Sequence, residues 1–352
     1  MVSEKTLVCA LVKRMRANRS TVAKAVFSIL MALTLICAPF GAVAAAASAG
    51  CAASAGCAAS VGSPVSAGSA GATLAGRFPI TVVDGTGASV RIEREPERIV
   101  SLAPSNTEIL FKLGLGEKLV GVTTACDYPE AAKKIAKIGD YNINIEQVVA
   151  KRPDVVFAVA DLQMPVIEKL RELRITVVAV NPKTIDEVFS AMELIGDAAG
   201  EGIYARKVVE GLQARMKVVE RQLATLPANE RPPVFVEIWN DPLMTAGSGT
   251  FVDDLITKAG GRNIAGSMQG WPQISPETVI ASKPECIILT CYNKAEVMAR
   301  REWRKAPAIA SGQVYELMPD ILVRPGPRLV EGLEALAAIL HGDVLRGMKM
   351  AK

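Results

Sequence analysis

Asn144-Ile-Glu-Gln-Val-Val-Ala-Lys-Arg-Pro-Asp-Val-Val-Phe157 and Ser275-Pro-Glu-Thr-Val-Ile-Ala-Ser-Lys-Pro-Glu-Cys-Ile-Ile288 are two versions of one pattern. They align without a gap. Each has a capping residue, a glutamate two positions later, an apolar stripe, and then a proline and an acid before an apolar run. This pattern predicts a short helix that ends at the proline, followed by a buried strand.

A second pair of similar stretches lies ahead of the first pair. Thr107–Gly114 precedes the first repeated unit, and the similar Asp253–Gly260 precedes the second. Two similar pairs in the same order predict two related lobes. Small ligands usually bind in the cleft between two lobes, so we expect a binding site there.

Residues 1–44 have the three parts of an export signal: a basic stretch, an apolar segment from Ala25 to Phe40, and the candidate cleavage site Ala42-Val43-Ala44. An uncleaved anchor is the alternative, although Pro39 interrupts the apolar segment. Removing the signal's net +5 from the chain's +4 leaves the remainder at −1. The basic balance therefore gives no indication of a nucleic-acid partner.

Residues 45–76 contain no charged side chain and are mostly Ala, Ser and Gly, which predicts a flexible tether. Cys51 and Cys57 each follow Ser-Ala-Gly, and small residues before a cysteine are typical of a lipid-attachment site. Cys51 is the better candidate, although both positions lack the usual leucine three residues earlier. A low-complexity linker that contains cysteine is the alternative. We expect a periplasmic protein or one tethered to the outer face of the cytoplasmic membrane.

Strand and helix patterns alternate along the rest of the chain. They begin with a β-hairpin at Ile80–Ile92, and they predict an α/β lobe with a mainly parallel sheet over residues 77–183. Residues 184–227 show helical periodicity without a strand pattern, which predicts a linking helical segment. A second α/β lobe is expected over residues 228–352.

Cysteine and histidine provide no metal or catalytic motif. Cys126, Cys286 and Cys291 fall in the folded part without C-x-x-C spacing, so we expect all three to be structural and buried. His341 is the one histidine, and there is no G-x-S-x-G motif. These observations disfavour a secreted enzyme with a Ser-His-Asp triad and a histidine-rich zinc site. We expect no metal site, no cofactor and no catalysis; a tethered interaction module is a further alternative.

Several motifs resemble those of the Fe/B12 periplasmic-binding family, the helix-linked class of ABC-importer substrate-binding proteins. They occur in the family's order and cover roughly residues 78–342. The motifs are Arg-Ile-Val-Ser-Leu-Ala-Pro-Ser-Asn-Thr-Glu-Ile-Leu at 98–110, Asp-Tyr-Pro at 127–129, the 144–157 unit, Ala-Gly-Gly-Arg-Asn at 259–263 and Arg-Pro-Gly-Pro-Arg at 324–328. The resemblance implies an α/β fold with two Rossmann-like lobes joined by a long rigid α-helix and a ligand cleft between them.

The resemblance also implies a receptor that delivers a metal chelate to a membrane permease and its ATPase, and we expect a monomer. In this family an acidic residue near the tip of each lobe docks onto arginines of the permease. The matching positions here are Glu146 and Glu277. A glutamate in the first turn of a helix has a simpler explanation as well, because the helix dipole stabilises it.

Gly-Trp-Pro-Gln-Ile-Ser at 270–275 is similar to the vitamin B12-binding members, in which the tryptophan packs on the corrin ring. The resemblance implies this role for Trp271, and contacts to cobalamin side groups for Asp320 and Arg324. Further ligand contacts are expected from the cleft loops. The candidates are Ser105, Tyr141, Trp239 and Met244.

The predicted cleft is less aromatic than in those members. Ala125, Val159, Ile238 and Met244 stand where the vitamin B12-binding members carry aromatic residues. A ferric siderophore is therefore the alternative to a corrinoid, with a haem receptor as a weaker possibility. The simpler explanations also stay open: Trp271 as ordinary lobe packing, and Asp320 with Arg324 as a surface ion pair.

Overall fold

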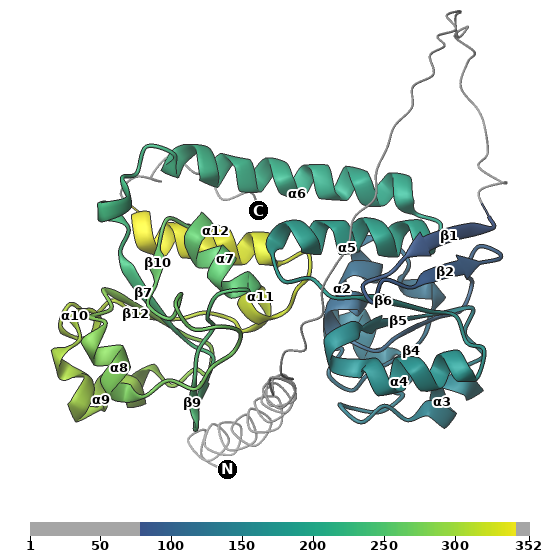
Figure 1. Cartoon of the computed structure of the whole chain (residues 1–352), viewed down its shortest axis with the longest axis horizontal. Helices are drawn as coiled ribbons and strands as arrows, with labels where there is room; N and C mark the ends of the chain where they lie inside the picture. The colour runs from purple at the N-terminus through teal and green to yellow at the C-terminus, as the bar shows by residue number, and fades with distance from the viewer. Residues whose placement is uncertain (1–77, 343–352) are drawn as a thin grey trace, which may run out of the picture.

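The computed structural model describes residues 78–342. The predicted export signal, the tether with Cys51, and the last ten residues lie outside this range. Figure 1 shows two α/β lobes side by side, with two long helices running along one side of the molecule.

The first lobe begins with a hairpin in which β1 (Ile80–Val83) pairs antiparallel with β2 (Ser89–Ile92). A parallel sheet of order β4-β3-β5-β6 follows. Its strands are β3 (Ile99–Ser101), β4 (Leu119–Val122), β5 (Val155–Val159) and β6 (Val177–Val180), and its helices are α2 (Pro104–Lys112), α3 (Ile145–Ala150) and α4 (Ala160–Glu172). Almost every strand side chain is buried, as expected for a parallel sheet covered by helices.

The second lobe contains a parallel sheet of order β10-β7-β11-β12 and a small hairpin, β8-β9. The strands are β7 (Pro233–Glu237), β8 (Trp239–Asn240), β9 (Leu243–Met244), β10 (Arg262–Asn263), β11 (Cys286–Leu289) and β12 (Val314–Glu316). The helices are α7 (Phe251–Lys258), α8 (Pro276–Ala281), α9 (Lys294–Ala299), α10 (Pro307–Ala310), α11 (Asp320–Val323) and α12 (Leu329–His341).

The two sheets have the same topology. In each, the first strand (β3 or β7) is followed by a helix (α2 or α7), a neighbouring strand (β4 or β10) and then the repeated unit, whose strand (β5 or β11) pairs on the other side. The duplication predicted from the two pairs of similar stretches is therefore confirmed.

The repeated units also agree in local geometry. The side chains of Asn144 and Ser275 each accept a hydrogen bond from the amide three residues later, at 2.9 and 3.2 Å. Each helix is followed by a residue of left-handed conformation, Arg152 with φ 47° and Lys283 with φ 48°, directly before the proline. The same cap, break and strand therefore occur in both lobes.

The linking segment holds two helices rather than one. Helix α5 (Ile185–Ala198) is followed by a turn at Gly200, where φ is 90°, and by α6 (Gly202–Leu223). The 22 residues of α6 span about 33 Å, so α6 is the long bridging helix that the fold class requires. It packs along α5 and against α12 of the second lobe (Figure 1).

Polar contacts attach this helix pair to the second lobe. The Asp254 carboxylate in α7 accepts a hydrogen bond of 2.9 Å from the Ile185 amide at the start of α5. The Lys258 ammonium lies 3.6 Å from Asp186 in α5 and 3.3 Å from Glu220 in α6. Since α5 also packs against α2 of the first lobe, the pair connects both lobes at fixed points.

Candidate functional site

The boundary between the lobes lies at the carboxyl ends of both parallel sheets. Glu108 in α2 follows β3, and Asp127 follows β4, whereas their partners Arg324 and Arg328 come from the segment after β12. Open α/β folds bind ligands at this edge of the sheet. We therefore place the candidate ligand site here.

Arg324 is the centre of an ion-pair cluster. Its guanidinium lies 2.8 Å from the Asp127 carboxylate, 2.9 Å from Asp320 and 3.2 Å from Glu108. Burial by itself would lower the pKa of Arg324, but attraction by Asp320, Asp127 and Glu108 outweighs this effect and raises the pKa. Arg324 therefore stays charged and can bind an anionic or carbonyl oxygen.

The structure brings Asp320 and Arg324 together, as the resemblance implied. The Arg324 side chain is only 14% exposed, and Asp320 is 22% exposed. The ion pair expected under the simpler explanation does form, yet it lies mostly buried and extends into the first lobe. Ligand contact by these two residues stays a prediction.

Two further residues, Arg328 and Tyr128, join this cluster. Arg328 donates to Glu108 and lies 3.3 Å from Asp320, and its guanidinium stacks 3.9 Å from the centre of the Tyr128 ring. We call Glu108, Asp127, Tyr128, Asp320, Arg324 and Arg328 the cross-lobe cluster. The sequence analysis assigned no site role to Glu108, Asp127, Tyr128 or Arg328. The sequence did contain an indication for Glu108. It is a charged residue directly before the apolar Ile109 and Leu110, in a helix whose side chains are largely buried, and a buried carboxylate needs a partner of opposite charge.

The two candidate tryptophans, Trp239 and Trp271, lie in the second lobe near Met244. Trp239 in β8 pairs with Met244 in β9, and Met244 forms a bridge to Gln273. Trp271, two residues earlier, is partly buried and packs edge-on against Phe251, with ring centroids 5.5 Å apart. Packing inside the lobe thus accounts for part of the Trp271 surface, and the remainder is exposed.

Met244 and Ser105 are more buried than the ligand-contact prediction requires. Met244 is 1% exposed, because its apolar side chain packs in the core beneath the β8-β9 hairpin. Ser105 is 6% exposed at the start of α2, where the Gly326 backbone approaches it. Both side chains are therefore almost fully shielded from solvent in this structure, and their ligand contacts stay predictions.

Tyr141 lies in the loop leading to α3 and is 40% exposed. Among residues 78–342, no hydrogen bond or ring contact joins Tyr141 to Trp271 or to the cross-lobe cluster. Its proposed ligand contact therefore stays a prediction.

The two candidate docking residues occupy equivalent places on the two lobes. Glu146 lies in the first turn of α3 and Glu277 in the first turn of α8, and both side chains are exposed. Hydrogen bonds from its own amide and from the Ser275 hydroxyl lower the pKa of Glu277. In Figure 1, α3 and α8 lie on the lower side of their lobes, away from α6. Docking itself stays a prediction.

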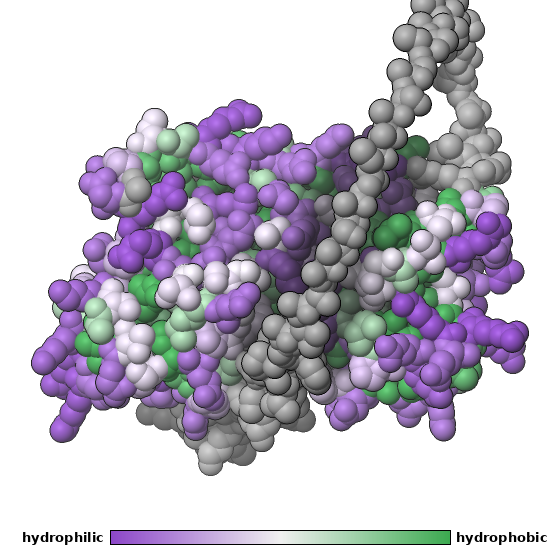
Figure 2. Space-filling view, viewed as in Figure 1, coloured by the Kyte–Doolittle hydropathy of each residue, from purple (hydrophilic) through white to green (hydrophobic). Residues whose placement is uncertain are grey.

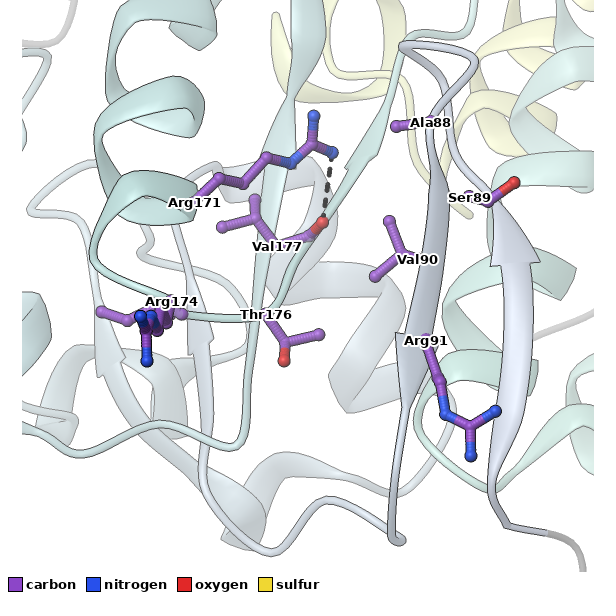
Figure 3. A pocket seen from close by; sticks show the side chains of 9 residues that line it. Ala88, Ser89, Val90, Arg91, Arg171, Arg174, Thr176 and Val177 are labelled. Carbon is purple, nitrogen blue, oxygen red and sulfur yellow. Dashed lines mark hydrogen bonds between the residues drawn. The ribbon is translucent and has the colours of Figure 1, made fainter.

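Two cavities lie elsewhere on the molecule. One, of about 330 Å³, is lined by Arg91, Arg171, Arg174 and neighbours, and Figure 3 shows the Arg171 guanidinium directed at the Val177 carbonyl. The other, of about 400 Å³, lies beside Arg262 and Glu285. Most of these residues lie at or before the beginning of their strands, so both cavities are separate from the lobe boundary.

In Figure 2, hydrophilic side chains cover much of the visible face of both lobes.

The three cysteines of the described residues are free, and Cys126 and Cys286 are buried as expected. Cys291 is only partly buried, because β11 has already ended at Leu289. Within residues 78–342, His, Cys, Asp and Glu form no group that could hold a metal ion. No helix in the same range is both long and apolar enough to cross a membrane.

Comparison with known sequences identifies the family. Residues 99–321 match the family described as periplasmic binding protein. The Bacillus subtilis protein YvrC, named as an uncharacterized ABC transporter substrate-binding lipoprotein, is 36% identical over 275 residues, which cover 76% of this chain and 88% of that protein. A vitamin B12-binding protein of Vibrio cholerae is 31% identical over 248 residues, covering 69% of this chain and 89% of that protein.

Solved structures show the same fold. The periplasmic vitamin B12 binding protein of Vibrio cholerae superimposes with a TM-score of 0.64 at 29% identity, over 72% of this chain and 99% of that one. A possible iron-binding protein of Staphylococcus epidermidis gives 0.63 at 29% identity, over 70% and 100%. The chain therefore belongs to the periplasmic binding protein family, as an exported substrate-binding protein of the ABC-transporter kind.

Proposed function

We propose that this protein captures a corrinoid of the cobalamin type outside the cytoplasmic membrane and delivers it to an ABC permease with its ATPase. The observation that carries the ligand class is the similarity to vitamin B12-binding proteins, which extends through both lobes and not only through short motifs. Family membership itself supports a binding protein rather than an enzyme.

The candidate site has groups that suit a corrinoid. The exposed part of Trp271 offers a flat apolar face, and large apolar contact with a planar macrocycle costs an aromatic side chain little conformational entropy. Arg324 keeps its charge at the lobe boundary and can donate to amide or phosphate oxygens of the side groups. Asp320 lies beside it and can accept from ligand amides.

A ferric siderophore is the second candidate. It is favoured by the similarity to the possible iron-binding protein of Staphylococcus epidermidis. The apolar but non-aromatic Ala125, Val159 and Ile238 also provide fewer stacking surfaces than a corrin ring uses. Arg324 would then pair with acidic groups of the chelate.

Calorimetric titration of the purified protein with cyanocobalamin tests the corrinoid proposal. Saturable binding with a Kd of about 1 μM or tighter, a free energy of about −8 kcal/mol, is expected. A folded sample that gives no heat with cyanocobalamin but binds a ferric siderophore would replace the corrinoid by the second candidate. Absence of binding to both would contradict the metal-chelate proposal.

We further propose that Cys51 carries a lipid that anchors the protein outside the cytoplasmic membrane. The Bacillus subtilis relative is named as a lipoprotein, which supports this proposal. Cys51→Ser is expected to release the protein from the membrane fraction, whereas the matched control Cys57→Ser should stay bound. Equal fractionation of Cys51→Ser and the unchanged protein would refute attachment at Cys51.

A further inference from the structure

Glu108 and Arg328 form a bidentate ion pair between the lobes. Arg328 Nε donates to Glu108 Oε2 at 2.8 Å, and Nη2 donates to Oε1 at 2.6 Å. Their positions are 220 residues apart in the sequence. The Glu108 side chain is 2% exposed and that of Arg328 is 9% exposed, so this contact is shielded from water.

A shielded pair of this kind influences geometry more than stability. Removing two charges from water costs about as much free energy as their attraction returns, so the net contribution of the pair to folding is small. Displacing one partner without rehydration leaves an uncompensated buried charge, which is strongly unfavourable. The bidentate geometry also restricts the angle between the groups. Glu108 and Arg328 therefore favour one separation of the lobes.

A second contact lies beside the first. Tyr128, after β4, stacks on the Arg328 guanidinium, and its neighbour Asp127 pairs with Arg324 at 2.8 Å. Helix α2, through Glu108, and the loop after β4, through Asp127 and Tyr128, thus hold two arginines of the second lobe. Because contact at two places resists rotation as well as separation, the lobes are restrained in both spacing and relative angle.

The same contacts restrain the candidate ligand-binding arginine. Glu108 Oε1 accepts from Arg328 Nη2 and lies 3.2 Å from Arg324 Nη1. Glu108 therefore connects the restraint on the lobes to the orientation of Arg324.

We propose that Glu108 is a positioning residue and that the cross-lobe cluster is a latch, which sets the spacing of the lobes before ligand binds. The helix pair α5-α6 joins the lobes on one side, and the latch holds them on the side of the candidate site (Figure 1). This inference rests on the proposed function only in assuming that the spacing serves to accept a ligand. The latch and the ligand class can therefore fail separately.

The latch is tested by measuring the distance between the lobes in the purified, ligand-free protein. Spin labels are attached through a bio-orthogonal amino acid at Ala150 in α3 and Ala281 in α8, two exposed and equivalent positions. This attachment avoids the native cysteines. In pulsed electron paramagnetic resonance the unchanged protein should give one narrow distance distribution. Glu108→Gln, which removes the charge at constant volume, should broaden it and shift it to longer distances.

Two further variants complete the test. Glu334→Gln is the matched control: it breaks the bidentate Arg215–Glu334 pair between α6 and α12, away from the lobe boundary, and should leave the distribution unchanged. Arg328→Lys keeps the charge but cannot form the bidentate contact, and it decides the question if Glu108→Gln does not fold. Broadening in the folded variant supports the latch. A lowered Tm with an unchanged distance distribution would show a purely stabilising role and overturn it.

Discussion

The Asp84 carboxylate joins the first hairpin to the sheet, beside a backbone hydrogen bond from the Gly85 amide to the Ala179 carbonyl. Asp84 accepts hydrogen bonds from the amides of Thr86 and Ala179 at 2.9 and 3.0 Å and from the Arg171 guanidinium at 2.5 Å. Burial by itself would raise the pKa of Asp84, but the hydrogen bond of 2.6 Å from the Thr86 hydroxyl, the two amide hydrogen bonds and the charge of Arg171 lower it below the ordinary value of 3.8. The hairpin therefore depends on an ionised Asp84.

Asp84→Asn is expected to lower the free energy of unfolding at pH 7 by about 3 kcal/mol, because it removes the buried charge that pairs with Arg171 and replaces one of the two accepting oxygens by an NH2 donor. Since the folded-state pKa is depressed, the stabilisation from Asp84 is present above the unfolded-state pKa and is lost as pH falls through the folded-state pKa. The variant should lack this acid-dependent loss. Urea unfolding at neutral and at acid pH measures both effects.

Glu93→Gln serves as the control for Asp84, since the Glu93–Arg91 pair on the same hairpin is exposed and should contribute little. Equal stabilities of the Asp84 and Glu93 variants would contradict the anchoring role of Asp84.

Trp271 offers a direct test of ligand contact at the level of one side chain. Trp271→Ala should weaken corrinoid binding roughly tenfold, about 1.4 kcal/mol, because the apolar stacking surface is lost. Titration calorimetry measures the change, with the exposed Tyr204→Ala on α6 as a control that should bind normally. Unchanged affinity in folded Trp271→Ala would assign Trp271 to packing against Phe251 alone.

Close approach between α5 and α6 depends on Gly196. A Cβ atom there would lie 2.4 Å from the Ala205 Cβ, whereas a Cβ at Gly211 in α6 would meet nothing within 4 Å. Helix α5 therefore has no room for a side chain at Gly196, whereas α6 has room for one at Gly211.

Gly196→Ala should therefore destabilise the protein by about 1–2 kcal/mol, because the helices must separate. Gly211→Ala should stabilise it by about 0.5–1 kcal/mol through higher helix propensity. Thermal unfolding of the two variants gives the comparison. Stabilisation by both substitutions would show that the helix pair tolerates a wider spacing than the structure indicates.

The elements with long or repeated patterns were predictable, and the short ones were not. The repeated helix–strand units, the first hairpin and the helical link follow from caps, prolines and periodicity within the segments themselves. By contrast, α9, α10 and β12 have six, four and three residues, too few for any period to show. They form because the chain between β11 and α12 packs on an existing sheet.

The predicted docking to a permease belongs to the whole molecule, since Glu146 and Glu277 lie on different lobes and the prediction requires both lobes at a fixed separation. Glu146→Lys together with Glu277→Lys should abolish ligand uptake by cells, because two like charges would face the arginines of the permease. Ligand affinity measured by calorimetry should not change. Glu168→Lys with Glu210→Lys, exposed positions in α4 and α6, is the control and should transport normally. Loss of affinity in the docking variant would contradict a role restricted to docking.

The candidate site was predictable only in part. Asp320 and Arg324 could be proposed from the family resemblance, and the structure places them at the lobe boundary. Ligand contact by Met244 stays a prediction; the burial of its side chain depends on how the β8-β9 hairpin lies against the core, which no local pattern encodes.

The sequence by itself determined the duplication, the order of the elements and the helical link, because capping residues, prolines and apolar periodicity act within a few residues of each other. Only the tertiary structure decided which charges meet. Glu108 and Arg328 lie far apart in the chain, and nothing near either residue specifies the other. Their pairing arises because two sheets with the same topology, connected by α5 and α6, bring their carboxyl ends together, where buried charges must find partners.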